Sequence, residues 1–455
     1  MIVSPAFAGR HYAVLGLART GMAAAEALLA SGARVTAWDR REGPREALEG
    51  RAEIADPLQF PLTGLDGIVL SPGVPLNTHP IAQRAADFGV PLVSDIELFA
   101  LARPSLPHHR VIGITGTNGK STTTALVHHL LESAGLPARM GGNIGLPILG
   151  QEPLPAGGVY VLELSSYQID LTFSLACDAV AVTNITPDHL DRYDGFDAYV
   201  ASKARLLEMQ RPDQFAVMGC ADEPTRAFYE RERLRRPASR MICAALEDWR
   251  ACQAEWPSLQ GPHNLQNAAI AAALAMEMGL SREQVLAGLA TYPGLAHRME
   301  RLGTFGGVLY VNDSKATNPA STAPALSAWP ADPRRRVHWI CGGLPKGDDL
   351  DECAPGFPNI AAAYTIGEAG PLFAELLEPH MHVERCEMLC EAVQRAIRAA
   401  VPGDVVLFSP ACASFDQFRD YETRGEFFRR LVLELAGGGE PGAAGAGCNP
   451  VGQPA

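Results

Sequence analysis

A glycine-rich loop between a predicted strand and a predicted helix carries the residues best suited to phosphate chemistry. The segment Val111 to Thr124 has the sequence VIGITGTNGKSTTT. Glycine lets the backbone turn tightly enough for several N–H groups to face one anion, and the following helix adds the positive end of its dipole. Lys120 supplies a charge for the outer phosphates, and the Ser121 hydroxyl can bind the accompanying magnesium. The segment therefore favours nucleoside triphosphate binding over a plain glycine turn before an exposed lysine.

Other polar residues of the central region could hold a metal ion or a substrate. Glu163 ends an apolar predicted strand, where a magnesium ligand would lie beside a phosphate loop. His189 lies in the polar loop after the next predicted strand, and we expect it to be a second metal ligand. Asn143, in a Gly-Gly-Asn-Ile-Gly turn, could be structural or could face a ligand. The spacing of Lys203 within a helix predicted over residues 196–209 indicates a solvated side chain.

The sequence Gly-Pro-His-Asn-Leu-Gln-Asn at residues 261–267 precedes an Ala-rich helix predicted over residues 268–278. His263 or Asn264 is expected to cap that helix, because a side-chain acceptor there satisfies its first backbone N–H groups. Asn267, on the first turn of that helix, could face the nucleotide.

The first hundred residues contain a second glycine loop, which resembles a dinucleotide-binding fingerprint. A predicted strand leads into the loop Gly16 to Gly21 and a helix, and a second strand ends at Asp39. Ala18 replaces the glycine that normally lets the backbone approach a pyrophosphate. The pattern indicates a Rossmann-like domain that binds NAD, binds a different diphosphate, or is purely structural. A third predicted strand runs into a Ser-Pro-Gly-Val turn at Ser71, at the sheet edge where ligands usually bind.

The last third of the chain repeats this pattern. Strands predicted over residues 308–311, 337–341 and 405–408 each end in a polar or glycine-rich loop. These loops have the sequences NDSKATN, GGLPK and SPACASFDQF. They predict a second doubly wound sheet with a binding edge.

The composition is that of an ordinary globular protein, and 455 residues suggest about three domains. A formal net charge of -13 argues against a non-specific nucleic-acid binder, which needs a basic face. The ten cysteines are scattered without a C-x-x-C pair, so we expect a reduced, cytoplasmic protein. No segment predicts export or membrane insertion. We expect a monomer, because no exposed apolar repeat calls for a partner.

With these motifs in place, the chain resembles the Mur ligase family. From Gly16 to about Leu435, the motifs GTNGKST, GGNIG, ELSSYQ, PDHLDRY, HNLQN, HRME, NDSKATN and SPACASFDQF occur in the expected order. The last two are similar to those of members that add D-glutamate, and the chain lacks the Asp-Asn-Pro-Arg signature of members that add a diamino acid. Folylpolyglutamate synthases share the central domain, but the N-terminal domain and the SPACAS motif point away from them. The family's GTNGK[ST]T form also explains Ile114 at the first glycine position of the general motif.

The resemblance implies an α/β protein of three domains: a Rossmann-like N-terminal domain, a P-loop ATPase central domain and a Rossmann-like C-terminal domain. These would bind the UDP-sugar, ATP and the amino acid, respectively. We place them at residues 1–105, 106–297 and 298–436, with a disordered tail over 437–455. The implied cofactors are ATP and Mg²⁺, and the implied substrates are UDP-N-acetylmuramoyl-L-alanine and D-glutamate. The implied reaction is an ATP-dependent amide ligation through an acyl phosphate; the base that deprotonates the amine is not identified.

The resemblance also implies roles for individual residues. The implied catalytic residues are Lys120, Lys203, His189 and Arg298, and the implied metal ligands are Ser121, Glu163, His189 and Lys203. The family counterpart of Lys203 carries a carbamate made from carbon dioxide, a role that the helix spacing does not predict. The implied nucleotide contacts are Gly116, Thr117, Asn118, Gly119, Lys120, Ser121, Thr122, Asn267, Arg298 and Asp313. The implied contacts to the other substrates are Leu17, Ala18, Arg19, Thr20, Asp39, Arg40, Ser71, Asn143, Lys315, Thr317, Lys346, Ser414, Phe415 and Tyr421, the last at a position where some relatives have phenylalanine.

Three other functions stay open on the sequence. The first is another amino-acid ligase of the same family. The second, an NAD-linked oxidoreductase, rests on Gly16, Gly21 and Asp39 and explains nothing after residue 110. The third, a nucleotide-binding switch, needs only the phosphate loop, and amino-acid-dependent release of phosphate from ATP distinguishes it from a ligase.

Overall fold

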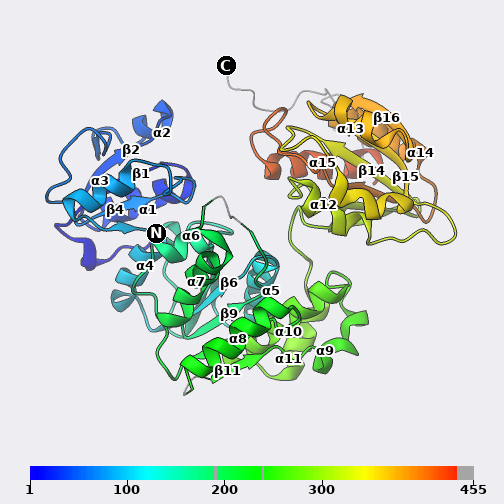
Figure 1. The fold of residues 1–455 in the computed structure, drawn as a ribbon. Helices are drawn as coiled ribbons and strands as arrows, with labels where there is room; N and C mark the ends of the chain where they lie inside the picture. The colour runs from blue at the N-terminus through cyan, green and yellow to red at the C-terminus, as the bar shows by residue number, and fades with distance from the viewer. Residues whose placement is uncertain (189–191, 238–239, 438–455) are drawn as a thin grey trace. The chain divides into compact units, whose positions relative to one another are not determined.

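The computed structural model describes residues 1–188, 192–237 and 240–437 of the chain. His189 and nearly all of the tail predicted to be disordered lie outside these residues. The chain forms two compact units, Met1–Tyr292 and a second that begins at Pro293. The first unit contains two sheets and the second unit contains one (Figure 1). The predicted α/β class is confirmed, whereas the predicted domain boundaries stay a prediction.

The first sheet is parallel, with the strand order β3-β2-β1-β4-β5. Its strands are β1 His11–Leu15, β2 Arg34–Trp38, β3 Glu53–Ile54, β4 Gly67–Leu70 and β5 Leu92–Val93. The helices of this part are α1 Arg19–Ala30, α2 Glu42–Glu46, α3 Ile81–Phe88 and α4 Asp95–Ala102. Because β2 and β4 pair with opposite sides of β1, the loops after β1 and β4 meet at one edge of the sheet.

The central sheet is also parallel, with the order β11-β10-β9-β6-β8-β7. Its strands are β6 His109–Thr115, β7 Ala138–Gly142, β8 Gly158–Glu163, β9 Ala179–Val182, β10 Phe215–Met218 and β11 Arg240–Cys243. Its helices are α5 Lys120–Ser133, α6 Ser166–Asp170, α7 Gly195–Glu208, α8 Glu223–Arg235, α9 Glu247–Arg250, α10 Pro262–Glu277 and α11 Arg282–Thr291. Since β6 pairs with both β8 and β9, the phosphate loop, Glu163 and the loop after β9 share one sheet edge.

Helix α10 begins earlier than the sequence predicted. Its first residue is Pro262 and its N-cap is Gly261, so His263 and Asn264 lie inside the helix. The prediction that His263 or Asn264 caps the helix is therefore wrong. Proline is favourable at the first helical position for two reasons. A backbone N–H there would have no partner within the helix, so nothing is lost by its absence, and the φ angle of proline is already helical.

Two cysteines of the central sheet form a disulfide, which contradicts the expectation of reduced thiols for this pair. Cys220 and Cys243 have Cα atoms 5.7 Å apart although 23 residues separate them in sequence. They come together because β10 and β11 are neighbouring parallel strands whose carboxyl ends lie side by side. Cys177, Cys341, Cys353, Cys386 and Cys412 are free and buried, as expected of thiols acting as small core residues.

Helix α4 joins the first sheet to the central sheet through buried polar contacts. The Ser94 and Thr172 hydroxyls lie 2.8 Å apart, and Glu97 Oε2 accepts hydrogen bonds from the backbone N–H groups of Phe173 and Ser174. Asp95 Oδ1 accepts a bond from Gln168 Nε2 at 3.4 Å. Asp95 Oδ2 is buried without a hydrogen-bond partner among the described residues. Burial raises the pKa of Asp95 to about 6.

Replacing Asp95 by asparagine should remove a pH-dependent loss of stability. The folded state holds the Asp95 proton up to about pH 6, whereas the unfolded chain releases it near its ordinary pKa of 3.8. The folded state thus binds more protons than the unfolded chain between pH 3.8 and about pH 6. The contribution of Asp95 to the free energy of unfolding therefore falls as pH rises through this range and is constant above it. The loss amounts to ~2–3 kcal/mol, and asparagine does not ionise. Denaturant unfolding of both proteins across this range should show the variant gaining relative stability with rising pH; parallel profiles would contradict the prediction.

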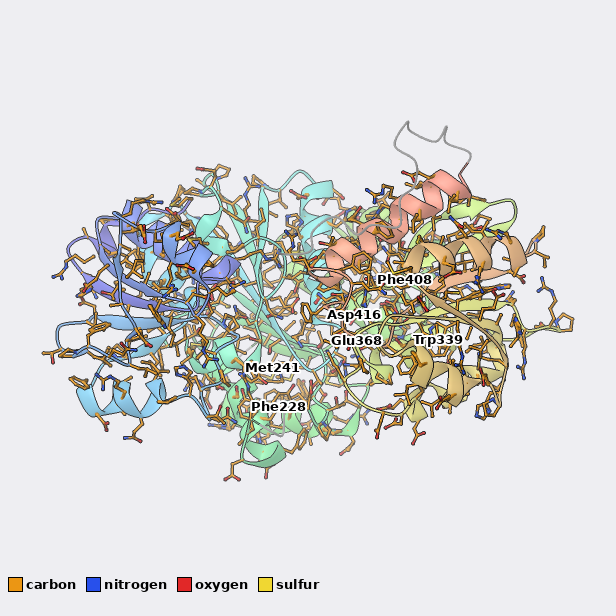
Figure 2. The ribbon with its side chains drawn as sticks, turned by 90° about the horizontal axis from the view of Figure 1, so that it is seen from above. Phe228, Met241, Trp339, Glu368, Phe408 and Asp416 are labelled. Carbon is orange, nitrogen blue, oxygen red and sulfur yellow. A yellow bond between two sulfur atoms is a disulfide. The ribbon has the colours of Figure 1, made fainter. Side chains whose placement is uncertain are left out.

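The third sheet lies in the second unit and has the order β12-β13-β17-β14-β15-β16. Its strands are β12 Glu300–Phe305, β13 Val308–Asn312, β14 Val337–Gly342, β15 Ile360–Ile366, β16 His382–Glu387 and β17 Val405–Phe408. Its helices are α12 Pro319–Leu326, α13 Gly370–Leu377, α14 Leu389–Ala399 and α15 Tyr421–Leu435. Only β12 pairs in an antiparallel sense among the described strands. Trp339 and Phe408, on neighbouring strands, belong to separate core clusters, so both faces of the sheet are covered (Figure 2).

Among the described residues, no helix is both long enough and apolar enough to cross a membrane.

Candidate active site

The phosphate loop connects β6 to α5, and its conformation requires two of its glycines. Gly116 and Gly119 have φ angles of 141° and 81°, which side chains rarely adopt. A Cβ atom at Gly119 would also collide with the side chain of Asn267. The Lys120 ammonium donates hydrogen bonds to the carbonyl oxygens of Gly116 at 3.0 Å and Thr117 at 2.7 Å. The structure therefore brings Asn267 to the predicted phosphate loop and holds the Lys120 charge over it.

The loop after β9 supports the phosphate loop, a role that the sequence interpretation missed. The Thr183 hydroxyl donates a 2.6 Å bond to the Asn118 carbonyl oxygen. The Asn184 side-chain oxygen accepts a 2.8 Å bond from the Asn118 backbone N–H. The sequence did contain one signal for this role. Thr183 and Asn184 follow a strand that pairs with β6, and the carboxyl ends of neighbouring parallel strands meet at one edge of the sheet.

Glu163 ends β8 with one oxygen engaged and the other without a partner. Its Oε1 accepts a 2.9 Å bond from Asn143 Nδ2. Its Oε2 is buried and has no hydrogen-bond partner among the described residues. A buried carboxylate oxygen without a partner is unfavourable unless a cation or a donor binds it. Ser121, buried in the first turn of α5, adds a hydroxyl oxygen at the same sheet edge. These oxygen donors fit Mg²⁺.

Lys203 is almost completely buried, with 1% of its surface exposed, so the solvated interpretation of its helix spacing is wrong. Its ammonium donates a 2.9 Å bond to the Gly116 carbonyl oxygen and lies 4.4 Å from the centroid of the Tyr199 ring. Burial, followed by the nearby positive charge of Lys120, lowers the pKa of Lys203 to about 7. In a substantial fraction of the molecules Lys203 is then a neutral amine near neutral pH, and the neutral amine is the form that can react with carbon dioxide.

A series of aromatic rings leads from this lysine to a pocket at the edge of the first sheet. The Tyr199 hydroxyl lies 3.2 Å from the Thr117 hydroxyl of the phosphate loop. The Tyr193 ring is 5.5 Å from Tyr199 and 6.1 Å from Tyr167, and it is nearly parallel to Tyr167. The Arg192 guanidinium lies 4.2 Å from the centroid of the Tyr167 ring. We call Tyr167, Tyr193 and Tyr199 the tyrosine ladder.

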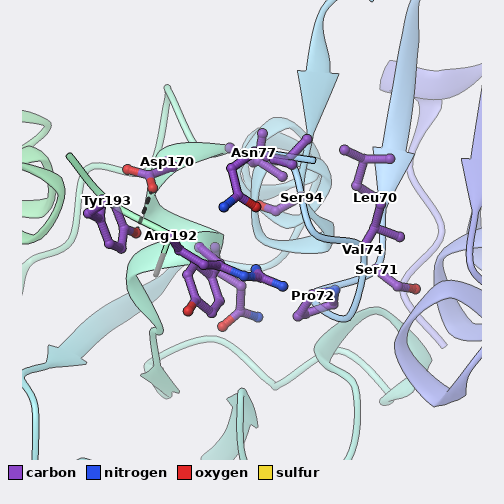
Figure 3. A pocket seen from close by; sticks show the side chains of 13 residues that line it. Leu70, Ser71, Pro72, Val74, Asn77, Ser94, Asp170, Arg192 and Tyr193 are labelled. Carbon is purple, nitrogen blue, oxygen red and sulfur yellow. Dashed lines mark hydrogen bonds between the residues drawn. The ribbon is translucent and has the colours of Figure 1, made fainter. Parts of the chain in front are cut away.

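The pocket lies between the loop after β4 and helix α6 (Figure 3). Its lining residues are Leu70, Ser71, Pro72, Val74, Leu76, Asn77, Ser94, Tyr167, Gln168, Asp170, Leu171, Arg192 and Tyr193. Ser71 was predicted from its turn at a sheet edge, whereas the contributions from α6 and from Arg192 were not. The two sides come from segments about a hundred residues apart, so local patterns could not show that they meet.

The glycine loop after β1 is held in place by residues that the sequence pointed to as substrate contacts. Asp39 Oδ2 accepts a 2.7 Å bond from the Leu17 backbone N–H. The Ser71 hydroxyl donates a 2.7 Å bond to the Gly16 carbonyl oxygen. A Cβ at Gly21 would collide with that same carbonyl group. Ala18 is the N-cap of α1, Arg19 and Thr20 form its first turn, and Arg40 is exposed nearby. The structure thus brings these positions together at one edge of the first sheet, where the Asp39 carboxylate holds the backbone of the glycine loop.

In the second unit, Asp313 follows β13 and is buried among donors. Its Oδ2 accepts a 2.7 Å bond from the Ser409 hydroxyl, and its Oδ1 accepts a 3.0 Å bond from the Met299 backbone N–H. Burial raises the pKa of Asp313 to about 7, against the lowering effects of these bonds and of the Arg298 charge. The structure therefore places Arg298 near Asp313, and the resemblance implies both as nucleotide contacts.

Most of the other predicted residues of this unit lie on loops at the same edge of the third sheet, and Tyr421 is the first residue of α15. Lys346 Nζ donates a 3.2 Å bond to the Thr317 hydroxyl, and Lys315 Nζ lies 5.0 Å from the centroid of the Tyr421 ring. Ser414 Oγ is buried without a partner among the described residues, and Phe415 is 70% exposed.

Two residues that the sequence interpretation missed tie these loops together. Arg424 is buried in α15 and donates bonds to the carbonyl oxygens of Ser314, Cys412 and Ala413, next to Lys315 and Ser414. Asp416 accepts a 3.2 Å bond from the Glu368 backbone N–H, and the two residues lie close together (Figure 2). Asp416 lies within the SPACASFDQF motif, but the sequence does not show that it binds the distant loop at Glu368.

A phosphate loop beside a buried, partly unsatisfied carboxylate on a parallel sheet defines a nucleotide-binding α/β protein. Three family models match the chain: a Mur ligase MurD-like N-terminal domain at residues 10–94, a Mur ligase middle domain at 114–275, and a Mur ligase glutamate ligase domain at 297–412. The chain therefore belongs to the Mur ligase family.

Curated relatives match nearly the whole chain. A UDP-N-acetylmuramoylalanine--D-glutamate ligase of Novosphingobium aromaticivorans is 65% identical, over 96% of this chain and 97% of the relative. A protein of the same name from Zymomonas mobilis is 50% identical, over 96% of this chain and 100% of the relative.

Solved structures share the fold at low sequence identity. UDP-N-acetylmuramate-alanine ligase MurC of Thermotoga maritima is 17% identical, with a TM-score of 0.56 over 92% of this chain and 98% of the other. MurF ligase of Thermotoga maritima in complex with ADP is 14% identical, with a TM-score of 0.54 over 95% of this chain and 97% of the other. These likenesses bear on the fold alone.

Proposed function

We infer that this chain is an ATP-dependent, ADP-forming ligase that adds D-glutamate to UDP-N-acetylmuramoyl-L-alanine in peptidoglycan precursor synthesis. The observation that carries the inference is the near-complete match to relatives bearing that activity in their names, at up to 65% identity. The arrangement of the phosphate loop, Lys120 and Glu163 supports the ATP-dependent step. Because this pathway stage uses cytoplasmic metabolites, we place the protein in the cytoplasm.

The chemistry follows from the poor reactivity of a carboxylate. The alanyl carboxylate attacks the γ-phosphorus of ATP, the bond to the β-phosphate oxygen breaks, and an acyl phosphate and ADP form. The amine of D-glutamate then attacks the acyl carbon, and inorganic phosphate leaves with the electron pair of the broken C–O bond. Lys120 neutralises charge on the transferred phosphoryl group, and the phosphate loop aligns it.

Ser121 and Glu163 would hold Mg²⁺, which supplies charge neutralisation for the phosphates when bound. The unpartnered Glu163 oxygen supports this assignment. Asn143 keeps the other oxygen of Glu163 in place and so orients the carboxylate. His189 was predicted as a further ligand and lies outside the described residues.

The pocket beside Ser71 fits the sugar part of the sugar nucleotide. Its lining combines aliphatic side chains with hydroxyl and amide groups, which suits a ring that carries both hydroxyls and C–H faces. The glycine loop before α1, from Leu17 to Thr20, would hold the diphosphate at the helix N-terminus.

Lys315, Thr317, Lys346, Ser414, Phe415 and Tyr421 are proposed for the second unit's part of substrate binding. The buried Ser414 hydroxyl, without a partner among the described residues, supports a ligand at that position.

The test is ADP release measured with D-glutamate, L-alanine, L-lysine and diaminopimelate, each with its matching sugar-nucleotide acceptor. We expect release with D-glutamate and UDP-N-acetylmuramoyl-L-alanine together, and little with any other pair. Equal release with another amino acid would assign the chain to a different branch of the family. Release without any amino acid would instead favour a nucleotide switch.

A further inference from the structure

We propose that Arg192 recognises the acylated sugar of the sugar nucleotide and thereby contributes to substrate specificity. The inference rests on the proposed function and concerns the pocket beside Ser71. Figure 3 shows the Arg192 side chain reaching from its loop toward Pro72 on the opposite side of the pocket. No pattern in the sequence distinguished this arginine from its neighbours.

The charges of the pocket leave Arg192 available to a ligand. Among the lining residues, Asp170 and Arg192 carry charges. Asp170 Oδ2 already accepts a 2.8 Å bond from the Tyr193 hydroxyl. Arg192 forms neither an ion pair nor a side-chain hydrogen bond within the described part of the chain, and its contact there is the face of the Tyr167 ring at 4.2 Å. Stacking on a ring leaves the N–H groups at the edge of the guanidinium able to bind oxygen atoms.

The tyrosine ladder fixes where this guanidinium lies relative to the phosphate loop. Tyr167 and Tyr193 are stacked with an interplanar angle of 9°. The Tyr193 hydroxyl donates a hydrogen bond to Asp170 Oδ2 and lies 3.3 Å from the Ser202 hydroxyl. Tyr199 continues the series to Thr117 of the phosphate loop. A sugar bound to Arg192 would therefore be held at a defined distance from the γ-phosphate, which is what attack by its attached carboxylate requires.

The chemistry of the remaining lining indicates which substrate group Arg192 binds. Ser71, Asn77 and Gln168 are neutral hydrogen-bonding residues suited to sugar hydroxyls. A guanidinium prefers oxygen atoms with full or partial negative charge. The diphosphate is assigned to the loop before α1 and the terminal carboxylate to the phosphate loop. The carbonyl oxygens of the acetamido and lactyl groups on the sugar are the partners left for Arg192.

The decisive variant is Arg192→Gln, assayed by steady-state ADP release. We expect KM for UDP-N-acetylmuramoyl-L-alanine to rise about 10- to 100-fold, since a hydrogen bond to a charged group is lost. KM for ATP and for D-glutamate should stay unchanged. The inhibition constant of UDP should also stay unchanged, because UDP lacks the acylated sugar. Arg192→Lys, which keeps the charge but loses the planar fork, should fall between the wild type and Arg192→Gln.

The ring beneath the guanidinium gives a second, independent measurement. Tyr167→Leu removes the stacking platform and should raise the same KM, whereas Tyr167→Phe should raise it less. The double variant with Arg192→Gln should be no worse than Arg192→Gln alone if the ring acts through the arginine. The matched control is Arg205→Gln, because Arg205 also lies over a ring, that of Phe173, and does not line the pocket.

Two outcomes would overturn the inference. A normal KM for the sugar nucleotide in Arg192→Gln, in a protein with wild-type thermal stability, would show that Arg192 does not bind it. An equal loss of UDP affinity would place the contact on the nucleotide and not on the acylated sugar. Failure of the wild type to release ADP with any substrate pair would instead contradict the proposed function.

Discussion

Lys120→Ala should reduce D-glutamate-dependent ADP formation by at least about 10²- to 10³-fold. The Lys120 ammonium lies over the phosphate loop on the carbonyl oxygens of Gly116 and Thr117, so it is positioned where charge develops on the transferred phosphoryl group. Removing one preorganised donor from such a site typically costs that much in rate. The measurement is ADP release at saturating ATP, sugar nucleotide and D-glutamate, with thermal unfolding to show that the variant is folded.

The control for this variant is Arg139→Ala, which removes a cation from strand β7 of the same sheet but not from the phosphate loop. It should keep near-normal turnover. Lys120→Arg keeps a positive charge but changes its reach, and should recover only part of the rate. Near-normal turnover of Lys120→Ala would contradict the assignment of this loop to ATP.

Lys203→Ala should lose most of its activity and regain part of it when a short carboxylate such as formate or acetate is added. The proposal is that Lys203 carries a carbamate, which supplies a carboxylate toward the metal. The structure supports it in two ways: the side chain is buried beside the phosphate loop, and its lowered pKa makes the reactive neutral amine accessible near neutral pH. A small carboxylate can enter the space that the shortened side chain leaves.

Carbamylation itself can be measured apart from activity. The chain has four lysines, Lys120, Lys203, Lys315 and Lys346, so a carbamate signal after ¹³C-bicarbonate labelling has few possible sources. We expect one NMR signal that is absent from Lys203→Ala and still present in Lys346→Ala. A labelled wild type without such a signal, or an inactive Lys203→Ala that no carboxylate rescues, would argue that Lys203 acts as an amine.

The sequence predicted the catalytic edge of the central sheet because its signals are local. Gly116, Gly119 and Lys120 occur within one loop whose backbone angles only glycine adopts readily. Glu163 could be placed beside that loop because strand ends of a parallel sheet share an edge, and β8 does pair with β6. The same reasoning located Asp313 and the loops with Lys346 and Ser414 at the ends of strands in the second unit.

Local reasoning failed where a residue's environment comes from distant segments. Lys203 has the helix spacing of a solvated residue, yet it is buried and its ammonium binds the Gly116 carbonyl oxygen, 87 residues away in the sequence. Local patterns also did not show that the Asp39 carboxylate binds the backbone of Leu17. The Cys220–Cys243 disulfide depends on β10 and β11 being neighbours. In each case the deciding contact joins residues that no short sequence window contains.

The sequence by itself therefore determined the fold class, the phosphate loop and the order of the polar loops, because these depend on strand and helix periodicity and on the special backbone freedom of glycine. Only the tertiary structure showed which oxygen of Glu163 has no hydrogen-bond partner among the described residues and that Lys203 is buried. Only the tertiary structure showed that the Arg192 guanidinium packs on the ring of Tyr167 within the pocket. Those properties arise from packing between elements far apart in the chain, and burial and pairing of charges are set by that packing alone.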